Sequence, residues 1–435
     1  MNTSHVQEQP RSLDAWLSYL ESIHTQEIDM GLDRTLKVAQ TLKVLNPSTK
    51  VITVAGTNGK GSSVAMLDAI LREAGYSTAC FTSPHLVDYR ERVLVNGLML
   101  PEEAHCEAFS AVNLARDNTS LTYFEFGTLA ALWLIKRSQV DVAILEIGLG
   151  GRLDAVNIVD SDLSIVTSID IDHVGFLGDN REDIGFEKAG IYRAGKPAIC
   201  GDPNPPQRLL EHAQNIGAQL LCVKQDYDVQ HTAEGWDFKL CSARAKLSLA
   251  PLHGLPEPQL PLANALGVIA GLQHAGFNVS DAEIAAGLKI AAVAGRFEVW
   301  PGTPQIILDV AHNPHAARYL SKKLAELRTQ SVNETKVIGV CGMLADKDIH
   351  ATLAELTGVI DTWYFATLPG SRAAKAEQLI SSLGVMGPTP QSFDSIEAAF
   401  IKAQHEAGPN DVIVCFGSFL TVAAIYAFKG RTIGG

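Results

Sequence analysis

The sequence lacks the features of a disulfide-stabilised or zinc-binding protein. Its 435 residues include only seven cysteines, an odd number, and no two of them form a Cys-x-x-Cys pair. Neither a disulfide framework nor a zinc motif is therefore indicated. Because most of the cysteines stand within apolar, strand-like runs, we expect them to be small core residues of a protein in a reducing compartment.

Positive charge is also scarce. The chain has 35 Lys and Arg against 48 Asp and Glu, which gives a formal net charge of -13. An acidic chain repels the phosphates of nucleic acid and the headgroups of acidic membranes. We expect neither as a partner, and local lysines and arginines would have to attract any anionic small-molecule substrate.

Long apolar segments and targeting signals are missing too. The longest apolar run, residues 412–428, is divided by Gly417-Ser418 into a strand and a helix, each too short to cross a bilayer. The first residues are polar and acidic, without the basic and then apolar pattern of a signal peptide. We therefore expect a cytoplasmic protein that acts on small molecules, and we expect it to be a monomer.

The alternation of apolar runs predicts an α/β protein with two domains. In residues 1–294, strands separated by helices indicate a P-loop-containing ATPase domain with a mainly parallel sheet. A hairpin is predicted over residues 237–250. A boundary is expected near residues 293–297, and a second alternation, with strands at 305–310, 336–341, 362–366 and 411–416, predicts a smaller Rossmann-like C-terminal domain over residues 295–435.

The most informative stretch is Gly56-Thr57-Asn58-Gly59-Lys60-Gly61-Ser62. It follows a β-branched run that predicts a buried strand, and helical spacing begins at Ser62. A strand, a glycine-rich turn and a helix are the context in which backbone N–H groups cradle phosphates, with Lys60 as a mobile cation. The first glycine and the hydroxyl are shifted from the common P-loop pattern, so an ordinary glycine-rich turn is the alternative.

Acidic and polar side chains stand at the predicted carboxyl ends of several strands. They are Ser83, Glu146, Asp170, Asp172 and His173. Ligands bind at this edge of a doubly wound sheet, and oxygen ligands beside nucleotide phosphates suit Mg²⁺. The alternative for each acid taken singly is a helix cap or a structural salt bridge.

A second group of polar residues stands in the C-terminal domain. Asp309 ends a predicted strand and could bind ribose hydroxyls, as acids do in other nucleotide sites. Arg296, at the proposed boundary, could reach phosphates. Asn313 precedes Pro314 and is expected to cap a helix, a role that is compatible with a site at Asp309.

Taken together, these motifs resemble the folate branch of the Mur ligase superfamily, the folylpolyglutamate synthases. The phosphate loop is similar in its shifted glycine and in Lys60-Gly61-Ser62, and further motifs follow in the family's order over about residues 12–420. These further motifs are Thr82-Ser83-Pro84-His85-Leu86, Thr122-Tyr123-Phe124-Glu125, Glu146-Ile147-Gly148-Leu149-Gly150-Gly151-Arg152-Leu153-Asp154-Ala155, Glu187-Lys188-Ala189-Gly190-Ile191, Gly295-Arg296-Phe297-Glu298 and Asp309-Val310-Ala311-His312-Asn313-Pro314.

The resemblance implies ATP-dependent amide ligation. A carboxylate of a pterin substrate would attack the γ-phosphate of ATP, and L-glutamate would then displace phosphate from the acyl phosphate. Dihydropteroate and reduced folates are the implied acceptors, and Mg²⁺, expected as two ions, is the implied metal. Two other functions stay open: a Mur-type ligase of peptidoglycan precursors, and an ATPase switch that joins no substrates.

The resemblance also assigns roles to single residues. Contacts to ATP are implied for Thr57, Asn58, Gly59, Lys60, Gly61, Ser62, Asn264, Arg296, Asp309 and His312. A pocket for dihydropteroate or folate is implied for Thr122, Tyr123, Phe124, Glu125, Arg152, Leu153, Asp154 and Ala155. The implied Mg²⁺ ligands are Ser83, Glu146 and His173, and the implied catalytic residues are Lys60, Lys188 and His173.

Lys188 resembles the lysine that becomes carbamylated in this superfamily. A carbamate would turn its cationic amine into a carboxylate-like Mg²⁺ ligand, an N6-carboxylysine. The alternative is an ordinary lysine that pairs with Glu187 on the surface of a helix.

Overall fold

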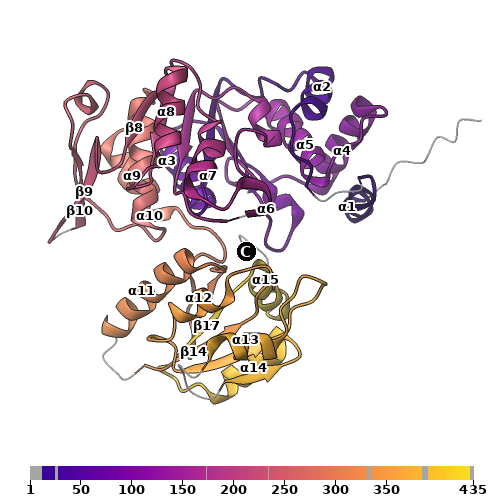
Figure 1. Ribbon diagram of the computed structural model, residues 1–435, viewed down its shortest axis with the longest axis vertical. Helices are drawn as coiled ribbons and strands as arrows, with labels where there is room; N and C mark the ends of the chain where they lie inside the picture. Colours follow the sequence, from indigo (N-terminus) through magenta and orange to yellow (C-terminus); the bar gives the residue numbers. More distant parts are fainter. Residues whose placement is uncertain are drawn as a thin grey trace, which may run out of the picture. The chain divides into compact units, whose positions relative to one another are not determined.

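The computed structural model describes residues 12–24, 28–172, 174–233, 235–330, 335–384 and 390–431. The chain forms two compact units (Figure 1). The first unit comprises residues 1–85 and 90–291, and the second comprises residues 86–89 and 292–435. The short segment Leu86–Tyr89 therefore belongs to the second unit, although the chain on both sides of it belongs to the first.

The first unit is built on an eight-stranded sheet with the order β4-β3-β2-β5-β1-β6-β7-β8. The strands from β2 to β8 in this order pair in parallel, whereas β3 pairs antiparallel with both β2 and β4. Their bounds are β1 (Lys50–Ala55), β2 (Thr78–Phe81), β3 (Val93–Val95), β4 (Leu98–Met99), β5 (Val142–Glu146), β6 (Leu163–Val166), β7 (Pro197–Cys200) and β8 (Gln219–Cys222). The central strands are almost entirely apolar because helices cover a parallel sheet.

The helices of this unit follow the predicted alternation. Helices α3 and α9 pack on the central strands, α10 packs on α3, and α5 packs on β2 and β3. Their bounds are α1 (Leu13–Ser22), α2 (Asp33–Leu42), α3 (Lys60–Glu73), α4 (Glu102–Arg116), α5 (Tyr123–Ser138), α6 (Val174–Leu177), α7 (Arg181–Ala189), α8 (Gln207–Ile216), α9 (Leu262–His274) and α10 (Asp281–Ile290). The described residues also form the 3₁₀ helices η1 (Tyr89–Arg92), which begins in the segment of the second unit, η2 (Ala155–Ile158) and η3 (Ala245–Leu247).

The hairpin predicted over residues 237–250 is wrong. A three-stranded antiparallel sheet forms instead from β9 (Tyr227–Thr232), β10 (Gly235–Leu240) and β11 (Leu252–Leu255), and β10 pairs with the strand before it. The reason is the buried carboxylate of Asp226, which accepts hydrogen bonds from Ser242 Oγ at 2.7 Å and Arg244 Nε at 2.7 Å. These bonds fold the chain after β10 into a turn and η3.

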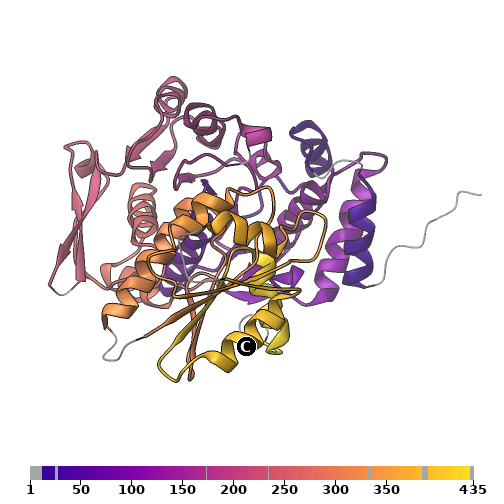
Figure 2. The ribbon, with the colours of Figure 1, turned by 60° about the horizontal axis from the view of Figure 1, so that its bottom comes forward.

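The second unit has a six-stranded sheet with the order β12-β13-β17-β14-β15-β16, and its strands can be followed in Figure 2. Five strands pair in parallel and β12 runs antiparallel at one edge. The bounds are β12 (Glu298–Trp300), β13 (Gln305–Asp309), β14 (Val337–Cys341), β15 (Thr362–Ala366), β16 (Gln391–Phe393) and β17 (Val412–Phe416). The predicted Rossmann-like arrangement is confirmed.

Two apolar clusters cover this sheet. Side chains of α11 (Pro314–Gln330), α12 (Ile349–Ala354) and α13 (Ala376–Leu383) pack in one cluster. Those of α14 (Ile396–Glu406) and α15 (Phe419–Phe428) pack in the other, together with Leu86. The apolar run at residues 412–428 forms β17 and α15, as predicted, and within the described ranges no helix is both long and apolar enough to cross a membrane.

Candidate active site

The phosphate loop lies between β1 and α3, where the sequence predicts it. Helix α3 begins at Lys60, two residues earlier than expected, and Gly59 caps it in a left-handed conformation with φ of +88°. Since the first N–H groups of a helix have no partner within it, they are available to an anion. Lys60 Nζ donates to the Gly56 carbonyl at 3.0 Å, so the cation lies directly over the loop.

Two positions in the loop admit only glycine. At Gly56, where φ is +152°, a Cβ would lie 1.8 Å from Thr167 Oγ1. At Gly59 a Cβ would lie 2.4 Å from Oδ1 of Asn264, the α9 residue for which an ATP contact is implied. The shifted first glycine is therefore a steric requirement of this loop, and Asn264 lies against it.

Hydroxyl and main-chain groups just beyond β6 brace the loop. Thr167 Oγ1 donates to the Asn58 carbonyl at 2.7 Å, and Asn58 N donates to Ser168 Oγ at 3.1 Å. Thr57 Oγ1 donates to the Asp170 carbonyl at 3.1 Å and accepts from Asp170 N at 3.0 Å. Sequence reasoning missed Thr167 and Ser168, although two hydroxyls at the end of a strand were the signal that could have found them.

Glu146 and Ser83 lie together beside this loop. Glu146 ends β5, pairs in register with Val54 of β1 and is 5% exposed. Its Oε2 accepts a hydrogen bond from Ser83 N at 3.2 Å, and a Cβ on Gly61 would lie 3.8 Å from the same oxygen. A buried carboxylate at the edge of a phosphate loop is the type of donor that Mg²⁺ prefers.

The third implied metal ligand, His173, lies outside the described residues. Across the residues that the structure describes, no three His, Cys, Asp or Glu side chains gather as a metal site. Among the described residues, Glu146 and Ser83 would offer oxygen donors to a divalent cation, and such donors together with phosphate oxygens and water suit Mg²⁺.

Lys188 is buried, so the alternative of a surface lysine paired with Glu187 is wrong. The side chain belongs to α7 and is 3% exposed, and Glu187 instead binds Arg152 at 2.7 Å. Burial, assisted by the positive charge of Lys60, lowers the pKa of the Lys188 amine to about 7. A large share of this amine is therefore uncharged at neutral pH, the form in which it can act as a nucleophile.

A pocket of about 710 Å³ lies next to Ser83. The structure brings together in its wall the predicted segments Thr122–Glu125 and Leu153–Ala155. The remaining residues that line it are Leu20, Glu21, His24, Ile28, Asp29, Met30, Gly31, Ser83, Pro84, Arg92, Gly148 and Leu149. This volume suits a ligand of drug-like size.

Sequence reasoning found Glu125 and Asp154 but missed the other titratable residues of this lining, which are Glu21, His24, Asp29 and Arg92. The guanidinium of Arg92 lies 5.5 Å from the centre of the Tyr123 ring, and Arg92 Nε donates to His85 Nδ1 at 2.8 Å. His24 Nε2 lies 3.5 Å from Asp29 Oδ2. His24, Asp29 and Arg92 stand outside the family's motifs, so no signal in the sequence marked them, whereas His85 and Tyr123 belong to two of those motifs.

Glu125 lies in the wall mainly as a structural group. Its Oε2 accepts from Thr122 N at 2.7 Å in a capping box at the start of α5. Its Oε1 accepts from Arg34 Nη2 at 3.0 Å and from Thr35 Oγ1 at 3.1 Å. The Thr-x-x-Glu pattern at positions 122–125 is the signature of a capping box and could have predicted this role.

Phe124 also lines the pocket. Its ring packs on the main chain of Gly148, where a Cβ would lie 2.4 Å from Cζ of the ring. A half-buried ring held in this way offers one face to a flat ligand.

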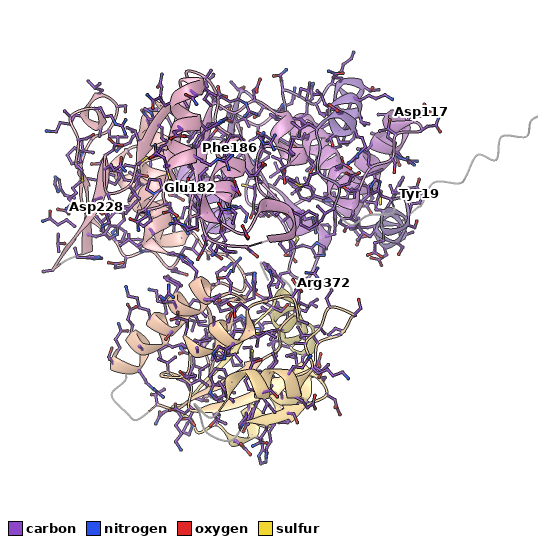
Figure 3. The ribbon with its side chains drawn as sticks, in the orientation of Figure 1. Tyr19, Asp117, Glu182, Phe186, Asp228 and Arg372 are labelled. Atoms are coloured by element: carbon purple, nitrogen blue, oxygen red, sulfur yellow. The ribbon has the colours of Figure 1, made fainter. Side chains whose placement is uncertain are left out.

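Asp154 and Arg152 differ in their placement. Asp154 lines the pocket and accepts from Leu149 N at 2.9 Å and Val156 N at 2.9 Å. Burial raises the pKa of its carboxyl group to about 6 despite these bonds. Arg152 is not among the residues that line the pocket, because its guanidinium binds Glu187 and lies 5.6 Å from the ring centre of Phe186, which is labelled in Figure 3.

In the second unit the structure brings Arg296, Asp309 and His312 together. The guanidinium of Arg296 lies 5.5 Å from the ring centre of Phe419. The ring centre of His312 lies 6.3 Å from the same Phe419 ring centre. Asp309 is 6% exposed and accepts from Phe297 N at 2.8 Å. Burial raises the pKa of the Asp309 carboxyl group, while Arg296 opposes that rise.

The helix that follows Asp309 confirms one structural prediction. Asn313 Oδ1 accepts from Ala316 N at 2.9 Å at the start of α11, whose first residue is Pro314. Phe419 was missed by sequence reasoning, because it stands in an apolar run that gave no reason to single it out.

Two family models match the chain. The Mur ligase middle domain matches residues 54–235, and the Mur ligase, glutamate ligase domain matches residues 295–419. The first match contains the phosphate loop, Glu146 and Lys188, and the second contains Arg296, Asp309 and Phe419.

Individual proteins resemble the chain over nearly its whole length. It is 47% identical over 424 residues to the dihydrofolate synthase/folylpolyglutamate synthase of Escherichia coli K12, covering 97% of each chain. The solved structure of E. coli FolC in complex with DHPP and ADP matches with a TM-score of 0.91 at 46% identity, covering 97% of this chain and 98% of that one. The Yersinia pestis bifunctional folylpolyglutamate synthase/dihydrofolate synthase complexed with AMPPNP and Mn ion matches with a TM-score of 0.89 at 46% identity, with the same coverage.

Proposed function

Since the chain belongs to the family of the dihydrofolate synthase/folylpolyglutamate synthases, we propose that it is an ATP-dependent amide-forming ligase with two acceptors. It adds L-glutamate to dihydropteroate to form dihydrofolate, and to reduced folates to form polyglutamates. One observation carries this proposal: Ser83 lines the pocket, and its N–H binds Glu146, which lies against Gly61 of the phosphate loop. A substrate carboxylate and the phosphates of ATP would therefore meet at this point.

The phosphate loop binds ATP in this proposal. Residues 57–62 surround the phosphates with N–H groups of the loop and of the first turn of α3, and Asn264 holds the nucleotide from α9. Ser83, Glu146 and His173 hold Mg²⁺, which we propose is present as two ions. When bound, Mg²⁺ neutralises part of the charge of the phosphates.

In the reaction, the substrate carboxylate first reacts with ATP, and the amino group of L-glutamate reacts afterwards. An oxygen of the substrate carboxylate attacks the γ-phosphorus of ATP, its bond to ADP breaks, and an acyl phosphate forms. The amino group of L-glutamate then attacks the acyl carbon and loses a proton, the C–O bond breaks, and phosphate leaves with the carboxylate oxygen that had attacked the γ-phosphorus. The chain contributes the charge of Lys60, which reduces the repulsion between the anions, and a pocket wall that excludes water from the acyl phosphate.

The pocket holds the pterin part of either acceptor. Support comes from its volume of about 710 Å³ and from the half-buried ring of Phe124, on which a flat pterin can stack. Thr122–Glu125 and Leu153–Ala155 form its wall, in agreement with the roles that the resemblance implies. For Arg152 we propose an indirect role through Glu187, because its guanidinium is engaged there.

We extend the proposal to carbamylation of Lys188. The uncharged amine attacks CO₂, the new N–C bond forms, and one proton leaves, so that the neutral amine becomes a carbamate anion. Burial of the side chain and the positive charge of Lys60 favour this change, since they disfavour the ammonium form. An intact mass without the added CO₂ in protein equilibrated with bicarbonate and Mg²⁺ would contradict this part of the proposal.

The two units have different roles in this proposal. We propose that residues 1–294 carry the phosphate loop and the folate pocket, and that residues 295–435 add ATP contacts through Arg296, Asp309 and His312. We further propose a monomer that acts on small molecules in the cytoplasm. All seven cysteines are free thiols, which supports a reducing compartment.

The activity is tested by offering each acceptor separately. Purified protein is incubated with ATP, Mg²⁺ and L-glutamate, and with either dihydropteroate or tetrahydrofolate, and products are measured by mass spectrometry. We expect both acceptors to gain the mass of one glutamyl unit. A gain with one acceptor only would reject the bifunctional assignment, and ATP hydrolysis without any gain would favour a switch.

A further inference from the structure

The turn that carries Arg296 has an unusual backbone. Gly295 and Phe297 both have left-handed conformations, with φ of +66° and +44°. A phenylalanine rarely adopts such a conformation, so contacts around the turn must hold it. Since Arg296 stands between these two residues, the direction of its side chain depends on what fixes the turn.

The main chain of this turn is bonded at several points. Gly295 N donates to Glu298 Oε2 at 2.8 Å, and the Gly295 carbonyl accepts from Val310 N at 2.8 Å. Arg296 N donates to the Val293 carbonyl at 3.1 Å. Phe297 N donates to Asp309 Oδ2 at 2.8 Å, so two side chains, Glu298 and Asp309, hold the main chain of the turn, and a substitution of either can alter it.

Two aromatic side chains hold the carboxylate of Glu298. Trp300 Nε1 donates to Oε1 at 2.6 Å, and the Tyr426 hydroxyl lies 2.6 Å from Oε1 and 2.7 Å from Oε2. The two rings pack edge to face with centres 5.0 Å apart, and both residues are at most 5% exposed. We name Glu298, Trp300 and Tyr426 the Glu298 latch.

We propose that Glu298 is a positioning residue for nucleotide binding: the Glu298 latch fixes the turn and thereby directs Arg296 to the face of Phe419. This inference rests on the proposed function, in which Arg296 contacts ATP. A guanidinium held in advance against a ring loses less side-chain freedom when it binds an anion, so the latch lowers the KM for ATP. Glu298 itself does not touch the nucleotide in this account.

The substitution Tyr426→Phe tests the latch with little change in shape. It removes one hydrogen bond to a charged group, and we expect the KM for ATP to rise about 5-fold while kcat changes less than about 2-fold. Glu298→Gln is the second variant, and it is expected to raise the KM further, because its amide group places a donor among three donors. Steady-state kinetics with saturating acceptor and glutamate measure both values.

Tyr364→Phe is the matched control. Tyr364 is a buried tyrosine of β15 in the same unit, and its hydroxyl also binds a carboxylate, that of Glu406. We expect a loss of thermal stability similar to that of Tyr426→Phe, but an unchanged KM for ATP. An equal rise in KM in the control would overturn the positioning role, because general loosening of the unit would then explain both results.

A double-mutant cycle with Arg296→Met separates this inference from the function on which it rests. If the latch acts through Arg296, Tyr426→Phe has no further effect on the KM in the Arg296→Met background. An equal effect in both backgrounds, or no effect of Tyr426→Phe beside a large effect of Arg296→Met, overturns the inference alone. A wild-type KM in Arg296→Met rejects the ATP contact of Arg296 and the inference together.

Discussion

Neutral groups brace the phosphate loop of the first unit, whereas carboxylates brace the turn that carries Arg296 in the second unit. Hydroxyls of Thr167 and Ser168 hold the loop, but Glu298 and Asp309 hold the turn. In the proposed function the loop binds the phosphates of ATP, and carboxylates bonded to its main chain would oppose that attraction. The turn has to hold a cation in place, so carboxylates around it are favourable.

This difference suggests that the charge of a bracing group follows the charge of what the braced segment must bind. Both segments contain left-handed residues that need support, and a hydroxyl and a carboxylate both supply it. The two kinds of bracing group differ mainly in the electrostatic field that they place at the segment. Variants in which the bracing groups are exchanged, removed or titrated test this difference.

The largest effect is expected when a carboxylate is placed behind the phosphate loop. Thr167→Asp removes the donor to the Asn58 carbonyl and adds a negative charge near the phosphates. At about 6 Å and an effective dielectric constant of about 20, the repulsion is about 3 kcal/mol, which weakens ATP binding roughly 100-fold. Calorimetric titration with ADP measures it, and Thr167→Ser, which keeps the donor, should bind almost normally.

The opposite exchange in the second unit should have a smaller effect. Asp309→Asn removes the charge that faces Arg296 and leaves an amide that can accept only one of the two main-chain N–H groups. We expect the KM for ATP to rise about 10-fold and the stability to fall by about 1–3 kcal/mol. A variant with unchanged KM would show that the carboxylate supports the fold but not the arginine.

Glu125 provides a comparison with a carboxylate of the first unit that lies away from the phosphate loop. Glu125→Gln weakens the capping box and the ion pair with Arg34, so the free energy of unfolding should fall by about 1–2 kcal/mol. The KM for ATP should stay at its wild-type value. Urea unfolding measures the change in stability, and steady-state kinetics measure the KM. A raised KM for ATP would contradict the idea that Glu125 in the pocket wall acts independently of the phosphate loop.

The smallest effect is a pH dependence of stability that originates at Asp154. Its pKa of about 6 in the folded chain exceeds the ordinary aspartate value of 3.8, so the folded state binds more protons between these values. Stability from this group is therefore greatest below about pH 4 and falls as the pH rises through 6, by about 1 kcal/mol between pH 5 and 7.5. Asp154→Asn should lack this difference in urea unfolding, and an identical pH profile would contradict the raised pKa.

Local patterns made the phosphate loop predictable. The strand, loop and helix around residues 51–73 lie within one contiguous stretch, and the Asp309 to Pro314 motif does as well. The bracing groups were missed because each comes from a distant part of the chain: Thr167 lies about 110 positions from the loop, and Tyr426 lies 128 positions from Glu298. No periodicity in a single sequence reports such a contact.

Short or displaced elements were missed for a related reason. Strands β12 and β16 have three residues each, too few for an alternating pattern to be seen. The hairpin was placed wrongly because the chain after β10 is folded by the distant carboxylate of Asp226. Lys188 was identified by the resemblance to the family. Its burial could not be predicted, because it depends on how α7 packs in the folded first unit.

The most direct test of the account follows an oxygen atom from the acceptor to the phosphate. Dihydropteroate labelled with ¹⁸O in its carboxylate is converted with ATP and L-glutamate, and the released phosphate is analysed by mass spectrometry. An acyl phosphate formed beside the phosphate loop requires one ¹⁸O atom of each converted carboxylate to appear in the phosphate. Unlabelled phosphate, formed while the ¹⁸O atom lost from the carboxylate appears in water, would contradict the account.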